Sequence, residues 1–176
     1  MPDRRHPGKT HSVLQGESHI SADPLERITT ILGSCVSVCL FDPLKKIGGM
    51  NHFLLPSGTE DGCGSNRYGI HAMERLINQL IKAGGNKSLF QAKAFGGARM
   101  TDGLSDIGAS NAEFAKRFLS KEGISCIDHD FGGRQARRVF FFPTTGRAEV
   151  HVVADLPDLT ATTPAVTVPR TDITLF

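Results

Sequence analysis

Three apolar runs stand close together in the first third of the chain. Residues 28–32 are β-branched and apolar, as is typical of a strand. Residues 36–41 are apolar at successive positions, which indicates a strand buried on both faces. A third run, residues 47–55, is expected to be the next strand. Gly33 and Ser34 separate the first two runs and permit a sharp turn.

Further along, the apolar period changes from 2 to 3.6. Residues 68–83 carry their apolar side chains on one helical face, and Gly84 and Gly85 supply a stop, so we expect a helix there. A second amphipathic helix is expected over 109–122. Further strands are expected over 88–95, 124–127, 138–142 and 148–154, the last two as a hairpin. Strands come first and then mix irregularly with helices. This order favours an α+β domain, a layered mixed β-sandwich with two main helices packed on it.

The two ends of the chain lack such patterns. Residues 1–10 contain two prolines and four charged residues, and we expect a disordered segment. Residues 155–176 are rich in Thr and Pro, and we expect a flexible tail. The remaining residues, 11–154, are expected to form one domain.

Composition excludes several classes of function. The net charge of +2 argues against nucleic acid as the main partner. No run approaches the ~18 apolar residues of a membrane helix, so we expect no membrane insertion. The first eleven residues are polar and show no export signal. We therefore expect a cytoplasmic protein whose four cysteines are free thiols.

The candidate chemistry centres on Cys35 and His52, which lie 17 residues apart on segments expected to be neighbouring strands. A thiol beside an imidazole can act as nucleophile and base in acyl transfer through a thioester. The N–H groups of Gly33, Ser34 and Cys35 can face a developing oxyanion. A third group must orient the imidazole, and the nearest polar residues upstream are Thr29 and Thr30.

Two other interpretations of these residues remain open. The cysteine and the histidine can be structural, since most buried free cysteines are small apolar residues. A metal site can be drawn from Cys35, Cys39, His52, Cys63, His71, Cys126 and His129. No C-x2-C pair is present, however, so we expect no metal. The Gly96-Gly97 pair lacks the spacing of a phosphate-binding loop.

The stretch LGSCVSVCLFDPLKKIGGMNHFLLP resembles the signature of the CheD family, the chemoreceptor glutamine deamidases of bacterial and archaeal chemotaxis. LQGES upstream, FGGARM, IGASNAEFAKRFLSKEGI and DFGGRQARRVFFFPTTG extend the resemblance over roughly residues 13–153. It implies a fold similar to the catalytic domain of the cytotoxic necrotizing factor toxins. The family commonly carries Arg before the Asn that opens the second helix, where this chain has Ser110.

The resemblance also implies the function. Cys35 would be the nucleophile, His52 the base, and Thr29, six residues before the cysteine, the support of the histidine. Thr30 is the alternative if the register shifts by one. The substrate would be glutamine side chains of methyl-accepting chemotaxis receptors, reached at a shallow, exposed site without a metal or organic cofactor. The alternative is a binding module that docks a receptor or a CheC-type phosphatase with little catalysis.

Overall fold

The computed structural model describes residues 8–56, 63–102, 106–153 and 173–176. In these ranges the strands form two five-stranded sheets, in the order β1-β3-β8-β9-β10 (sheet A) and β2-β5-β4-β6-β7 (sheet B). The strands are β1 (Thr10–Ser12), β2 (Ser18–Ser21), β3 (Arg27–Leu32), β4 (Val36–Asp42), β5 (Ile47–Asn51), β6 (Gln91–Gly96), β7 (Ser125–Phe131), β8 (Ala136–Phe142), β9 (Arg147–Val153) and β10 (Ile173–Leu175). The pairs β1–β3 and β6–β7 are parallel and the others antiparallel.

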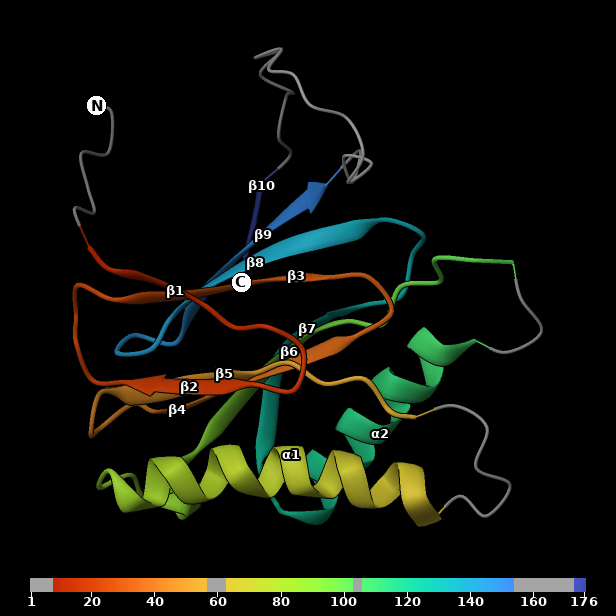
Figure 1. Ribbon diagram of the computed structural model, residues 1–176. Helices are drawn as coiled ribbons and strands as arrows, with labels where there is room; N and C mark the ends of the chain where they lie inside the picture. The colour runs from red at the N-terminus through yellow and green to blue at the C-terminus, as the bar shows by residue number, and fades with distance from the viewer. Residues whose placement is uncertain (1–7, 57–62, 103–105, 154–172) are drawn as a thin grey trace.

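Two helices, α1 (Cys63–Lys82) and α2 (Ile107–Lys121), cover the outer face of sheet B, while sheet A covers its inner face (Figure 1). The expected α+β layered architecture with two main helices is therefore confirmed. The first helix begins five residues before the expected start at Tyr68. The second begins at its cap, where the Asp106 carboxylate accepts a hydrogen bond from the N–H of Ala109 at 2.9 Å.

Strand β4 lies in the middle layer and is buried along its whole length. Val36, Val38 and Leu40 join the core between sheet B and the helices. Cys39 and Phe41 join the core between the two sheets. Alternate side chains of a strand point to opposite faces, so the unbroken apolar run fills two cores at once. The prediction of a strand buried on both faces is confirmed.

The chain ends differ from the expectation of a disordered start and a flexible tail. Thr10 already belongs to β1, while residues 1–7 lie outside the described residues. At the other end, Ile173–Leu175 pair antiparallel with β9, and Phe176 packs edge-on against Phe95 with ring centroids 5.6 Å apart. The prediction of a flexible tail is therefore wrong for residues 173–176. Residues 154–172 lie outside the described part of the chain.

We expect Phe176→Ala to lower the free energy of unfolding by roughly 1–3 kcal/mol, because the ring packs against the core between the sheets. Urea denaturation followed by circular dichroism measures the change. Leu175→Ala is the matched control, since Leu175 is 66% exposed and its truncation should cost less than about 0.5 kcal/mol. Equal losses in the two variants would show that the Phe176 contact adds nothing.

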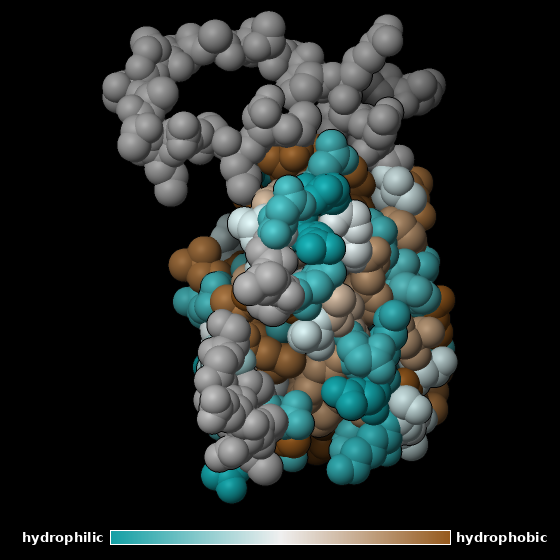
Figure 2. Space-filling model, turned by 90° about the vertical axis from the view of Figure 1, so that its right-hand side faces the viewer, coloured by the Kyte–Doolittle hydropathy of each residue, from teal (hydrophilic) through white to brown (hydrophobic). Residues whose placement is uncertain are grey.

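On the face shown in Figure 2, hydrophilic and hydrophobic residues are interspersed. Several large apolar side chains are exposed, among them Leu14, Leu44 and Val152. Single exposed apolar residues are ordinary for a folded protein. In the described part of the chain, no helix has the length and apolar character needed to span a membrane.

Candidate active site

Cys35 lies where the chain crosses from sheet A to sheet B. β3 ends at Leu32 and β4 begins at Val36, so the three-residue turn between them carries the thiol at the junction of the sheets. The side chain is half-buried and packs against the core between the sheets. The thiol is therefore both supported by the core and open to solvent.

His52 directly follows β5 and faces the same way as Cys35. Val36 and Phe53 exchange two backbone hydrogen bonds, of 3.0 and 2.9 Å, which places these two residues opposite each other. Cys35 and His52 each precede a member of this pair. Their side chains therefore leave the two strands on one common face. The sequence predicted that the segments carrying Cys35 and His52 are neighbouring strands, and in the structure β4 and β5 are paired.

A hydrogen-bond chain fixes the tautomer of His52. The hydroxyl of Thr30 donates to the backbone carbonyl of Val13 at 2.7 Å, and the same oxygen lies 2.7 Å from Nδ1 of His52. A hydroxyl has one proton to donate, so Thr30 accepts from the imidazole and Nδ1 carries the proton. Nε2 is left with a free lone pair. It is buried and has no hydrogen-bond partner among the described residues.

Thr29 does not contact the imidazole. Its hydroxyl donates to the backbone carbonyl of Val139 on the neighbouring strand β8, at 2.9 Å. The prediction that Thr29 supports His52 is wrong, and Thr30 takes that place. The reason is the period of the strand: Ile28 and Leu32 point into the core between the sheets, and only Thr30 shares their face. That alternation was visible in the sequence.

We expect Thr30→Val to lower kcat/KM for glutamine deamidation roughly 10- to 100-fold. Without the hydroxyl, Nδ1 of His52 loses its hydrogen-bond acceptor, and the imidazole is no longer held in one tautomer. Thr29→Val is the matched control. Both variants remove one buried hydroxyl of the same strand, so both should lose roughly 1 kcal/mol of unfolding free energy. Only Thr30→Val should lose activity. Equal activity in the two variants would contradict the role of Thr30.

Burial keeps both candidate catalytic groups neutral. Burial lowers the pKa of His52 below its ordinary value, although the nearby backbone of Val13 opposes the shift. Burial raises the pKa of the Cys35 thiol, and a hydrogen bond from its own backbone N–H opposes that shift. At neutral pH the pair is thus a thiol and a free imidazole. The thiol needs a base at the moment of reaction, and His52 is in the protonation state to act as one.

The other cysteines offer a contrast in thiol reactivity. Cys39 is fully buried, and burial raises its pKa far above the ordinary range. Cys126 is exposed, and its thiol donates to the carbonyl of Asp128 at 3.3 Å. The side chain of Cys63 lies outside the described residues.

With a limiting alkylating agent, we expect Cys35 to be labelled ahead of Cys39 and Cys126, because a free imidazole lies on its face of the sheet. Peptide mapping by mass spectrometry measures the order. His52→Gln should remove the advantage of Cys35 over Cys126. Faster labelling of Cys126 in the wild-type protein would argue against an activated Cys35.

The Gly96-Gly97 pair holds the backbone of the Cys35 turn. The N–H of Gly97 donates to the carbonyl of Cys35 at 2.8 Å, and the N–H of Ala98 donates to the carbonyl of Gly33 at 2.9 Å. Gly96 has φ +113°, and a Cβ there would collide with the carbonyl oxygen of Cys35. Only glycine lets the two backbones approach this closely. The Gly96-Gly97 pair therefore has a structural role at the turn that carries the thiol.

Asn111 ties the two halves of the site together. This fully buried side chain donates from Nδ2 to the carbonyl of Ser34 at 2.8 Å, and its Oδ1 accepts from the N–H of Leu55 at 3.0 Å. It therefore joins the turn before Cys35 to the segment after His52. Sequence reasoning placed Asn111 on the second helix without assigning it a role.

The backbone of the turn leaves donors available. All three carbonyls of Gly33, Ser34 and Cys35 are hydrogen-bonded. In the described part of the chain, the N–H groups of Ser34 and Cys35 have no acceptor from another residue. Donors of this kind beside a nucleophile suit a developing oxyanion. This arrangement is compatible with the oxyanion role predicted for the turn, which stays a prediction.

Sequence reasoning missed a fourth polar group at the thiol, Gln15. The thiol of Cys35 donates to Oε1 of Gln15 at 3.7 Å. No described hydrogen bond joins the thiol to His52. The loop that carries Gln15, residues 13–17, separates β1 from β2, and it also supplies the carbonyl of Val13 that orients Thr30. In the sequence, LQGES contributed only to the family resemblance, and Gln15 was assigned no role.

Among the described residues, one group has donors close enough together for a metal ion: His11, His19 and Glu26, within 4.8 Å of one another. The two imidazoles stack with an interplanar angle of 6° and centroids 3.6 Å apart. Lone pairs in parallel ring planes do not converge on one point. Nε2 of His19 is bonded to the Glu26 carboxylate at 2.8 Å instead. None of these three residues belongs to the metal set considered from the sequence.

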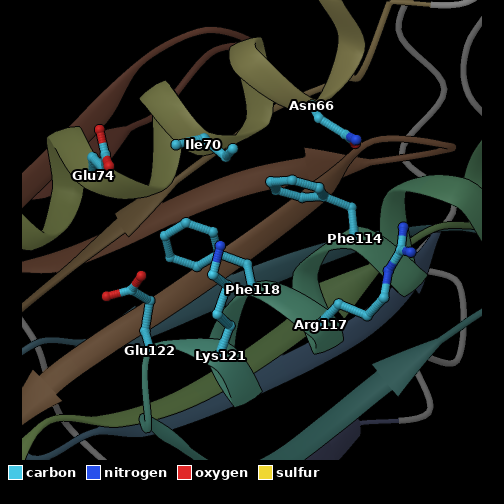
Figure 3. Close-up of a pocket in the computed structure, with 8 residues that line it drawn as sticks. All are labelled: Asn66, Ile70, Glu74, Phe114, Arg117, Phe118, Lys121 and Glu122. Carbon is cyan, nitrogen blue, oxygen red and sulfur yellow. The ribbon is translucent and has the colours of Figure 1, made fainter. Parts of the chain in front are cut away.

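A pocket of about 470 Å³ lies elsewhere, between the two helices (Figure 3). Its lining residues are Asn66, Ile70 and Glu74 on α1, and Phe114, Arg117, Phe118, Lys121 and Glu122 at α2. The helices cover the outer face of sheet B, whereas Cys35 and His52 face sheet A. The thiol therefore does not open into this pocket.

Comparison with known proteins points to one family. The CheD family, described as CheD chemotactic sensory transduction, matches residues 54–152. A protein of Caulobacter sp. (strain K31) called probable chemoreceptor glutamine deamidase CheD is 55% identical over 148 residues, 83% of this chain and 78% of that protein. A protein of Ruegeria sp. (strain TM1040) called probable chemoreceptor glutamine deamidase CheD 1 is 50% identical over 146 residues, again 83% and 78%.

Solved structures overlap more loosely. The Bacillus licheniformis hypothetical protein YfiH aligns with a TM-score of 0.45 and 15% identity, over 73% of this chain and 61% of that one. This chain thus spans less than two thirds of that protein. The sequence relatives are far closer and cover most of both chains. The chain belongs to the CheD family.

Proposed function

We propose that this protein hydrolyses the side-chain amide of glutamine in chemotaxis receptors, giving glutamate and ammonia. Its relatives are named as probable chemoreceptor glutamine deamidases. The observation that carries the proposal is the hydrogen-bond chain from Val13 through Thr30 to Nδ1 of His52, which leaves Nε2 unprotonated on the face of Cys35. A base so prepared beside a half-buried thiol suits acyl transfer.

In the proposed reaction, Nε2 of His52 takes the thiol proton as the sulfur attacks the amide carbon. The oxygen of that amide becomes negatively charged, and the N–H groups of Ser34 and Cys35 stabilise it. His52 then gives its proton to the departing nitrogen, which leaves as ammonia. Water attacks the thioester, with His52 again as the base, and the free thiol returns.

Thr30 acts through His52 rather than on the substrate. Its hydroxyl holds the imidazole in the tautomer that the reaction needs, as the carboxylate does in Ser-His-Asp hydrolases. Asn111 and the Gly96-Gly97 pair hold the turn in place. The half-buried thiol suits a substrate that is itself a protein surface, such as an exposed receptor helix.

The direct test is mass spectrometry of helical receptor peptides incubated with the protein. Each deamidated glutamine gains about 1 Da and releases one ammonia, which a coupled assay counts. Agreement of the two counts supports hydrolysis of side-chain amides. Binding of a receptor peptide or of a CheC-type phosphatase with no mass gain at any glutamine would reject the proposal in favour of a docking module.

A further inference from the structure

The side chain of Gln15 places a glutamine amide at the candidate nucleophile. The thiol of Cys35 donates a hydrogen bond to Oε1 of Gln15 at 3.7 Å, and among the described residues this is the one hydrogen bond that the thiol donates. A glutamine side chain is also the group on which the proposed reaction acts. The chain therefore holds, at its own thiol, the chemical group of its substrate.

The backbone of the Gln15 loop is fixed to the segment that carries the base. The N–H of Gly16 donates to the carbonyl of His52 at 2.8 Å, and the N–H of His52 donates to the carbonyl of Glu17 at 3.1 Å. Within the loop, the N–H of Leu14 donates to the carboxylate of Glu17 at 3.0 Å. The backbone of Gln15 thus stays beside the site unless these contacts break, whereas its exposed side chain is free to rotate at the thiol.

The other three glutamines of the chain are held elsewhere. Oε1 of Gln79 accepts from the hydroxyl of Ser18 at 2.8 Å. Gln91 begins β6 and lies opposite Phe41 in the sheet. Gln135 is exposed and immediately precedes β8. Of the glutamines that the structure describes, only Gln15 has a hydrogen bond with Cys35, so Gln135 serves as an exposed internal control.

We propose that Gln15 is an intramolecular substrate of Cys35 and is converted to glutamate. This inference rests on the proposed function. His52 takes the thiol proton, and rotation of the Gln15 side chain presents its amide carbon, Cδ, to the sulfur. The Cδ–Sγ bond forms and the Cδ–Nε2 bond of Gln15 breaks, with the proton from His52 leaving on ammonia. Water then cleaves the thioester, so that one amide and one water yield one carboxylate and one ammonium ion.

A tethered amide has a large advantage over a dissolved one, because the encounter with the thiol is already made.

The product of the reaction at Gln15, a glutamate side chain, also changes the site. A carboxylate beside Sγ disfavours the thiolate by like-charge repulsion. We therefore expect the modified chain to act more slowly on receptors than the unmodified chain.

The experiment follows the full-length protein and a receptor peptide in the same tube by peptide mapping. The Gln15 peptide should gain about 1 Da and the Gln135 peptide none, with Cys35→Ala protein as the unmodified reference. Cys35→Ser repeats this reference in case Cys35→Ala folds poorly. The first-order rate constant for conversion of Gln15 should not change over a tenfold range of protein concentration, since the reaction is within one chain.

The two proposals fail in different ways. Deamidation of the receptor peptide with an unchanged Gln15 would overturn the intramolecular reaction and leave the proposed function intact. No mass gain on either would reject the proposed function, and the inference with it. A rate constant for Gln15 that rises with protein concentration would also overturn the inference, because a second copy would then be the catalyst.

As a further readout, Gln15→Glu should slow alkylation of Cys35 at least twofold at neutral pH, whereas Gln135→Glu should leave it unchanged. Equal alkylation rates in the two variants would overturn the expected effect of the product on the thiol.

Discussion

Cys35→Ala should abolish the gain of mass at receptor glutamines, with a loss of roughly a thousandfold or more in turnover. The substitution removes the one atom that bonds to the amide carbon, and the described residues offer no second thiol at the site. Cys39 is fully buried in the core. Cys126 lies on β7, which is separated by β6 from β4, the strand that follows Cys35. Mass spectrometry of receptor peptides measures the loss directly.

Cys126→Ala is the matched control for this prediction. Cys126 is exposed and its removal leaves the site intact, so deamidation should continue at the wild-type rate. Circular dichroism and urea denaturation should show both variants folded. If Cys35→Ala still deamidates at the wild-type rate, the nucleophile is another group and the thioester route is wrong.

Much of the fold follows from the sequence because one face of each element is buried. The apolar run 36–41 marks the central strand β4 and fills both cores. The 3.6 period marks both helices, since each packs on sheet B with one face. The start of α1 was placed too late because Cys63–Arg67 lie in a Gly- and Ser-rich stretch that reads as loop.

The end of the chain was mispredicted for a different reason. Ile173–Leu175 is only three residues long, and its pairing partner β9 supplies the edge on which it forms. A strand that depends on a neighbour has no local signal beyond a few β-branched residues. The T-shaped contact of Phe176 with Phe95 joins residues 81 positions apart, which no local pattern encodes.

The site shows the same division. Cys35 and His52 can be chosen from the sequence because the residue types and the two strands point to them. Choosing Thr30 over Thr29 requires knowing which side chains of β3 point into the core, and the alternation of apolar residues in that strand contains this information. The assignment by distance from Cys35 instead selected Thr29, one residue away. Gln15 lies on a short loop without periodicity, and only the fold brings it to the thiol.

The pH dependence tests the protonation state assigned to His52. Burial lowers its pKa, so the neutral imidazole persists to more acidic solution than for an exposed histidine. Activity requires the neutral form, because only it accepts the thiol proton. The acid limb of kcat/KM should therefore lie below 6.5, the ordinary pKa of histidine. A midpoint above 6.5 would contradict a base kept neutral by burial.

His52→Gln should lower kcat/KM roughly 10²- to 10⁴-fold and remove the limb below 6.5, because glutamine neither accepts the thiol proton nor titrates. The matched control is His71→Gln on the exposed face of α1, which should leave both the rate and the limb unchanged. The residual activity of His52→Gln should rise with pH, as hydroxide replaces the base in forming thiolate from a thiol whose pKa is raised. A rate loss that leaves the limb below 6.5 in place would mean that another group titrates, and that His52 only positions the site.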